Sequence, residues 1–149
     1  MKKEDKILVK LNDVFLMNEA IEKTYEKTCE KASNTSTKAF LKEKSLERHN
    51  FGEMLQDEIK KFDTNVEESI MTRRRYHLYM KSFSSLLQIE NNRDLLNAIY
   101  DVELLCIEKY NKLLREINLS LSLCRLLVKQ QDNIQNGMRL IKKELVFIK

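Results

Sequence analysis

Four polar residues stand in the middle of otherwise apolar stripes of the chain. Each occupies a position where the three- and four-residue spacing of Leu, Ile, Phe and Tyr predicts an inward-facing side chain. They are Glu22, Glu47, Glu103 and Gln130. A carboxylate in an apolar interior is costly unless it is paired, protonated or bound to a cation. The pattern therefore predicts a polar belt that either holds a divalent metal ion or forms a buried hydrogen-bond network.

Further polar residues lie on the same stripes or within one helical turn of them. Their amides and hydroxyls can donate hydrogen bonds to the carboxylates, and a fully satisfied network fixes the register of the helices that it joins. The predicted additional members are Asn18, Tyr25, Asn50, Tyr110 and Asn133. If a metal ion is bound instead, the predicted ligands are Glu22, Glu47 and Glu103.

The stripes require long helices to carry them, and the composition favours such helices. The 149 residues include no proline and two glycines, and 34% of them are charged. This composition is typical of long helices rather than of sheets and loops. We expect helices over about 4–32, 37–62, 66–87 and 93–117, and a fifth after residue 120. The intervening breaks, at 33–36, 63–65, 90–92 and 118–120, are rich in Ser, Asn, Asp and Thr.

These helices predict an all-α fold with one domain over residues 1–149. Short connections make the first and second helices one antiparallel pair and the fourth and fifth another, which together form a four-helix bundle. The third, less regular helix is long enough to cross from one pair to the other.

The order of the belt residues along the chain resembles that of the ferritin-like di-iron bundles. In those proteins two helices each supply a Glu, and the other two each supply a Glu-x-x-His. More narrowly, LNDVFLMNEAIEKTYEKT (11–28) and EKSLERHNFGEMLQDEI (43–59) look like a bacterial ferritin-like family of unknown function. Members of that family commonly begin with an LNDLIEVN-like helix, followed by a helix that reads roughly ER-x-x-F-x-x-x-L. The resemblance covers most of the chain and implies a ferritin-like bundle with a crossover helix.

The chain departs from the di-iron pattern at both histidine positions. Asn50 and Asn133 stand where the pattern has His, and Gln130 replaces a Glu. Redox iron centres combine nitrogen donors with carboxylates, so the resemblance implies a degenerate site and no cofactor. The leading interpretation is a non-enzymatic structural, interaction or stress-related protein. The alternative is a metal-binding oxidoreductase or storage-type protein that uses the belt carboxylates.

Two features of the predicted third helix offer other functions. One is a run of three arginines, Arg73 to Arg75, which could bind an anion or a nucleic acid. Three consecutive arginines spread over about 200° of the circumference of a helix and do not share one face. We therefore expect solvated side chains and no nucleic-acid partner. An aromatic and Met set on the same helix either packs on the bundle, which we favour, or is a self-association surface for a homo-oligomer such as a dimer. Its members are Tyr76, Tyr79, Met80 and Phe83. The identity of any protein partner stays open.

The remaining sequence features bear on location. Cys29, Cys106 and Cys124 are odd in number and far apart, which is typical of core residues in a reducing compartment. No stretch approaches the roughly 18 apolar residues of a membrane span, and the first residues do not resemble a signal peptide. We therefore expect a cytoplasmic protein with no membrane partner.

Overall fold

Five α-helices and one short 3-10 helix make up the computed structural model, which describes residues 3–62 and 68–148. The elements are α1 (Lys3–Lys31), α2 (Thr35–Ile59), α3 (Glu68–Phe83), η1 (Ser84–Gln88), α4 (Asn92–Leu114) and α5 (Leu121–Phe147). No strand occurs in those two ranges, so the all-α prediction is confirmed. The predicted third helix divides into α3 and η1. The break expected at 63–65 lies outside the described residues.

Side chains at the predicted breaks begin three of the helices. Asn34, Asn91 and Ser120 each accept a hydrogen bond from the backbone N–H three residues later, at 3.0 to 3.2 Å. Such caps satisfy one of the N–H groups that the first turn of a helix leaves unpaired. Between α4 and α5, Asn118 adopts a left-handed backbone conformation with φ of 71°, which Asn tolerates better than most residues.

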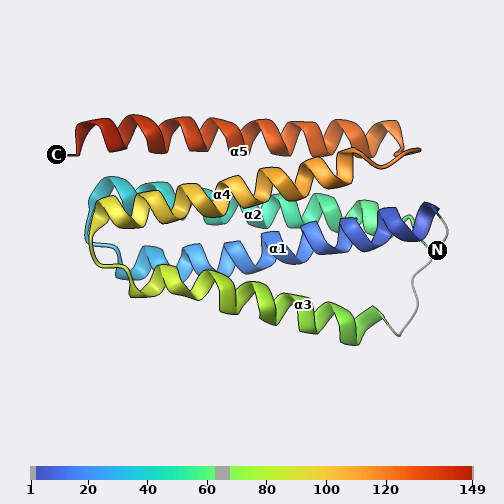
Figure 1. Ribbon diagram of the computed structural model, residues 1–149, viewed down its shortest axis with the longest axis horizontal. Coiled ribbons are helices and arrows are strands. Elements are labelled where there is room, and N and C mark those ends of the chain that lie inside the picture. Colours follow the sequence, from blue (N-terminus) through green and yellow to red (C-terminus); the bar gives the residue numbers. More distant parts are fainter. Residues whose placement is uncertain (1–2, 63–67, 149) are drawn as a thin grey trace.

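Successive helices run in opposite directions along the molecule (Figure 1). α1 and α2 form one antiparallel pair, and α4 and α5 form another. α3 runs along α1 on the side away from α5 and returns the chain to the end where α2 begins, so that α4 starts there as well.

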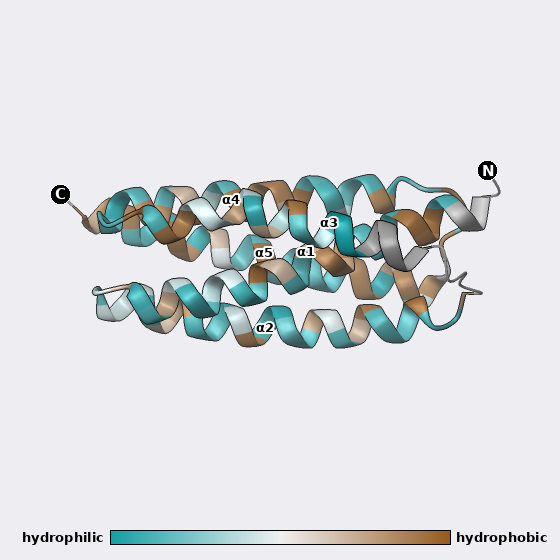
Figure 2. Ribbon diagram, turned by 90° about the horizontal axis from the view of Figure 1, so that it is seen from below, coloured by the Kyte–Doolittle hydropathy of each residue, from teal (hydrophilic) through white to brown (hydrophobic). Residues whose placement is uncertain are grey.

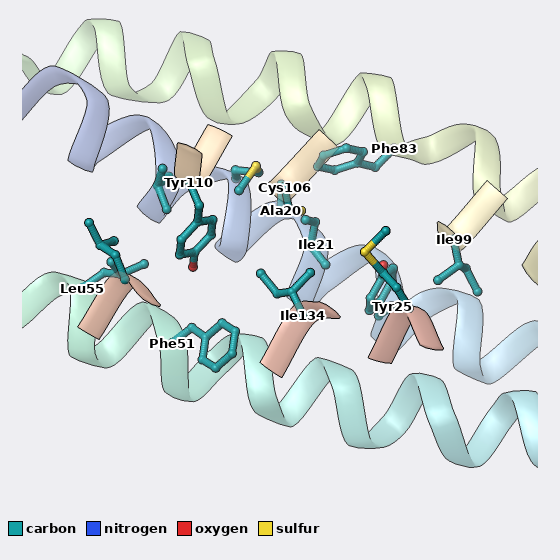
Figure 3. Packing of buried hydrophobic residues seen from close by; sticks show 14 of the residues in the cluster. Ala20, Ile21, Tyr25, Phe51, Leu55, Phe83, Ile99, Cys106, Tyr110 and Ile134 are labelled. Atoms are coloured by element: carbon teal, nitrogen blue, oxygen red, sulfur yellow. The ribbon is translucent and has the colours of Figure 1, made fainter. Parts of the chain in front are cut away.

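α1 is the central helix of the molecule, because α2, α3 and α4 all contact it. It is buried around most of its circumference, and Leu11, Met17, Ala20 and Ile21 have no exposed surface. Figure 2 shows hydrophobic and hydrophilic residues alternating along the helices, as packing on one face requires. Figure 3 shows Ile21 of α1 among core side chains that other helices contribute. No helix in the described ranges is long and apolar enough to cross a membrane.

The aromatic and Met set of α3 packs on the bundle, as the favoured interpretation predicts. Phe83 is buried, and Tyr76, Tyr79 and Met80 are partly buried against the core. Leu78 of the same helix is 62% exposed. The face of α3 that includes Leu78 therefore lies outside the main core.

Candidate functional site

Five of the predicted network residues meet in the interior of the bundle, at about mid-height. Each of them is at most 2% exposed. They are Asn18 and Tyr25 of α1, Glu103 and Tyr110 of α4, and Gln130 of α5. Figure 3 shows Tyr25 and Tyr110 among the apolar side chains of the core.

The centre of this network is a residue that the sequence analysis did not select, Arg48 of α2. Its side chain is 1% exposed, and its Nη2 donates to the Oε2 of Glu103. Its Nη1 donates to the Oδ1 of Asn18 at 2.7 Å and lies 3.5 Å from the Sγ of Cys106. A guanidinium and a carboxylate thus form an ion pair in the core, the arrangement that makes burial of either charge tolerable.

Hydrogen bonds continue from this pair to all four helices of the two antiparallel pairs. The hydroxyl of Tyr25 donates to the Oε1 of Glu103 at 2.7 Å. The Nδ2 of Asn18 donates to the hydroxyl of Tyr110 at 3.0 Å, and that hydroxyl donates to the Oε1 of Gln130 at 2.7 Å. The Nε2 of Gln130 donates to the carbonyl of Phe51 at 3.3 Å. We call the six residues that make these bonds with their side chains the inner network: Asn18, Tyr25, Arg48, Glu103, Tyr110 and Gln130.

Burial raises the pKa of two tyrosines of the inner network and of the neighbouring Cys106. Desolvation raises the pKa of Tyr25 well above its usual range, and the neighbouring charge of Glu103 raises it further. Burial also raises the pKa of Tyr110, and it raises the pKa of the Cys106 thiol to about 12. For Arg48, desolvation is the largest single effect and acts to lower the pKa, but the charge of Glu103 together with the effects of Cys106, Tyr25 and Tyr110 outweighs it, so the pKa lies well above the usual value. Near neutral pH these groups hold their protons.

The other four residues that were predicted for the belt do not lie in the inner network, so the prediction was wrong for them. Asn50 is exposed, whereas Glu22, Glu47 and Asn133 are partly buried. Successive residues of a helix are about 100° apart. Because Arg48 faces the interior, Glu47 lies to one side of the stripe, and Asn50 faces away from the interior.

Glu22 and Glu47, which lie outside the inner network, each have a basic side chain as a partner. The Oε1 of Glu22 lies 3.2 Å from the Nδ1 of the exposed His49. The Oε2 of Glu47 lies 3.1 Å from the Nζ of Lys44, whose side chain is largely buried. A Cβ at position 137 would lie 3.1 Å from the Cε of Lys44, so Gly137 of α5 leaves room for that lysine.

The arrangement of the three predicted metal ligands does not fit a divalent ion. Both carboxylate oxygens of Glu103 accept hydrogen bonds, from Arg48 and from Tyr25. A fixed guanidinium beside that carboxylate repels a second cation, and Glu22 and Glu47 pair with other residues. Among the side chains that the structure describes, no three His, Cys, Asp or Glu residues form a group suited to a metal ion.

The burial of Arg48 had a signal in the sequence. Leu41, Arg48 and Leu55 are seven residues apart, which is the repeat of an inward-facing position in a packed helix. A long charged side chain on such a stripe is ordinarily read as solvated, because Arg is almost never fully buried unless it is paired. Its partner, Glu103, lies 55 residues further along the chain, so local spacing does not reveal the pair.

Comparisons with protein-family models, with curated proteins and with solved structures found no match to this chain. The ferritin-like resemblance rests on its sequence motifs alone.

Proposed function

We propose that this chain is a non-enzymatic structural or interaction protein with a ferritin-like arrangement of helices. In it, a buried ion pair replaces the metal ligands of the di-iron pattern. The observation that supports this proposal is the contact of Arg48 with both Glu103 and Asn18 inside the bundle. The side chain at the centre of the belt is therefore a cation supplied by the protein.

The protonation states of the inner network favour a structural role over catalysis. General acids and bases work best when their pKa lies near the working pH. The guanidinium of Arg48 does not deprotonate in proteins, and burial keeps Tyr25 and Cys106 protonated at neutral pH. Tyr25, Arg48 and Cys106 are therefore not poised to exchange a proton with a substrate near neutral pH.

The burial of the inner network also favours a structural role over catalysis. Its residues are each at most 2% exposed, so a substrate would have to separate the helices to reach them. A hydrogen-bond network across four helices, in which only the Nε of Arg48 has no partner among the described residues, instead fixes their relative register. Any function that involves another molecule then belongs to the surface of the bundle.

Elemental analysis separates this proposal from the metal-binding alternative. The protein would be expressed with iron and manganese supplied and purified without chelator, as wild type and as Glu103→Gln. We expect far less than one metal ion per chain in both proteins. Near-stoichiometric metal in the wild type that is lost in Glu103→Gln would support the alternative, a di-metal oxidoreductase or storage-type protein.

The matched control is Glu108→Gln, because Glu108 lies on the same helix but is exposed. Metal that is lost equally from Glu103→Gln and Glu108→Gln would show adsorption to surface carboxylates, and the proposal would stand. Loss that is confined to Glu103→Gln would overturn it.

A further inference from the structure

A groove of about 480 Å³ lies between α3 and α4, over α1, away from the inner network. Its lining comes from three helices: Asp13 of α1, residues of α3 from Arg74 to Ser82, and Leu105 and Lys109 of α4. The volume is in the range of small-molecule sites, about 300–1,000 Å³. It is open to solvent, unlike the core.

One end of the groove is positively charged. Arg74, Arg75 and Lys109 line it, against a single carboxylate from Asp13. The Oδ1 of Asp13 accepts hydrogen bonds from the Nη1 of Arg75 at 2.8 Å and from the hydroxyl of Tyr79 at 2.7 Å. Its Oδ2 lies 3.4 Å from the Nζ of Lys109. Three cations around one anion leave a net positive charge at this end.

The rest of the groove is largely apolar. Leu78, which is 62% exposed, and the partly buried Tyr79 and Leu105 form its walls, and Ser82 lies at the far end. Arg75 and Ser82 are seven residues apart on α3, which corresponds to about 10 Å along a helix. The groove is thus about 10 Å long along α3 and joins a cationic end to an apolar surface.

We propose that this groove binds a small amphipathic anion, such as a medium-chain or aromatic carboxylate. The anionic group would lie near the guanidinium of Arg74 and the ammonium of Lys109, and the apolar part would lie along Leu78 and Leu105. Charge-assisted hydrogen bonds to Arg fix the orientation of carboxylates, and burial of apolar surface supplies most of the affinity of such ligands.

The positions of the three consecutive arginines favour this ligand over a nucleic acid. Arg74 and Arg75 line the groove, whereas Arg73 does not. Binding to a phosphate backbone needs a stripe of cations along the surface. Here the charge gathers at one end of a groove that also contains Asp13.

Calorimetric titration of the full chain with octanoate tests the proposal. We expect one octanoate per chain with a Kd between about 10 μM and 1 mM, as the size of this ligand allows. The uncharged analogue 1-octanol should bind at least about tenfold more weakly, because it lacks the charge that the cationic end recognises. No octanoate binding, or equal binding of 1-octanol, would overturn the proposal.

Matched variants place the site on the molecule. Arg74→Gln and Leu78→Gln should each weaken octanoate binding by about three- to tenfold. Arg73→Gln, adjacent on the same helix, should change it by less than about twofold. Leu46→Gln should also have little effect, because Leu46 is 60% exposed on α2, away from the groove. Equal effects of Arg73→Gln and Arg74→Gln would contradict the proposed site.

Lipid vesicles distinguish a free ligand from a lipid headgroup or membrane surface. Phosphatidylglycerol vesicles carry the same combination of anionic and apolar groups, and phosphatidylcholine vesicles serve as the uncharged control. We expect octanoate to bind in solution and the vesicles not to sediment the protein. Sedimentation with phosphatidylglycerol vesicles that Arg73→Gln and Arg74→Gln weaken equally would show binding by general surface charge and would overturn the groove proposal.

Discussion

The interior of the bundle and the groove beside α3 contain the same chemical arrangement in different surroundings. In the interior, Glu103 accepts hydrogen bonds from a guanidinium and from a tyrosine hydroxyl, those of Arg48 and Tyr25. At the groove, Asp13 accepts the same two kinds of hydrogen bond from α3. The side chain of the inner arginine is 1% exposed, and that of the groove arginine is 45% exposed.

This difference in exposure changes what each arrangement can do. In the interior, water is excluded and the polar groups bond to one another, so their bonds hold the helices in register. At the groove, water reaches the guanidinium of Arg75, which is 45% exposed, and an outside anion can reach the cations. The same side chains therefore favour rigidity in one place and ligand binding in the other.

The largest effect that we expect comes from Arg48→Met. This change leaves the carboxylate of Glu103 buried without its cationic partner, which typically destabilises a protein by about 3–5 kcal/mol. Urea denaturation monitored by circular dichroism measures the free energy of unfolding. A loss below about 1 kcal/mol would show that water reaches Glu103. The ion pair in the interior would then stabilise the protein no more than the ion pair at the groove.

A second substitution should restore much of this loss. In Arg48→Met/Glu103→Leu both charges are removed, and replacing a buried pair by apolar side chains is often neutral or stabilising. We expect the double variant to unfold within about 2 kcal/mol of wild type, with a large coupling energy in the double-mutant cycle. Additive losses from the two single variants would argue against a direct ion pair.

The corresponding change at the groove, Arg75→Met, should cost much less. The carboxylate of Asp13 is largely buried, but it keeps its hydrogen bond from Tyr79 and its proximity to Lys109. Because the guanidinium of Arg75 is 45% exposed, we expect a loss of about 1 kcal/mol. The same urea denaturation measures this loss. A loss equal to that of Arg48→Met would mean that Arg75 also organises the fold and that the contrast between the two regions fails.

The smallest effect should appear at an ion pair on the surface, between His49 and Glu22. The hydrogen bond and the charge of Glu22 raise the pKa of His49, and Glu53 adds to this effect. Because the folded-state pKa is raised, the stabilising contribution is complete below the unfolded-state pKa and is lost as the pH rises through the folded-state pKa.

NMR titration of the His49 ring measures this shift. In Glu22→Gln we expect the pKa of His49 to fall toward the usual value for histidine, since Glu22 contributes most to raising it. An unchanged pKa in this variant would show that Glu22 and His49 do not interact in solution. Glu53→Gln is the matched control and should lower the pKa less.

The helices and much of the inner network could be predicted because both follow local periodicity. Asn18 and Tyr25 belong to one seven-residue stripe, and Glu103 and Tyr110 belong to another, so their shared burial follows from helix geometry. The capping residues Asn34 and Asn91 are equally local signals.

The rotation of α2 could not be predicted in the same way. This helix offers two adjacent stripes, one through Glu47 and one through Leu41, Arg48 and Leu55. Which of them faces inward depends on Glu103 and Asn18, which come from other helices. The groove could not be predicted either, because its lining residues are far apart in the sequence. Asp13 and Lys109 come together only after α3 and α4 have packed against α1.

The separation in sequence of the inner-network partners has a consequence for the order of assembly. The helices of each antiparallel pair are adjacent in the chain, so their contacts close short loops and can form early. The bonds from α1 to α4 instead join residues 78 and 92 positions apart. They can form only when the two pairs dock. We therefore expect the bonds between the two pairs to form late in folding, and their contribution to appear mainly as a slower rate of unfolding.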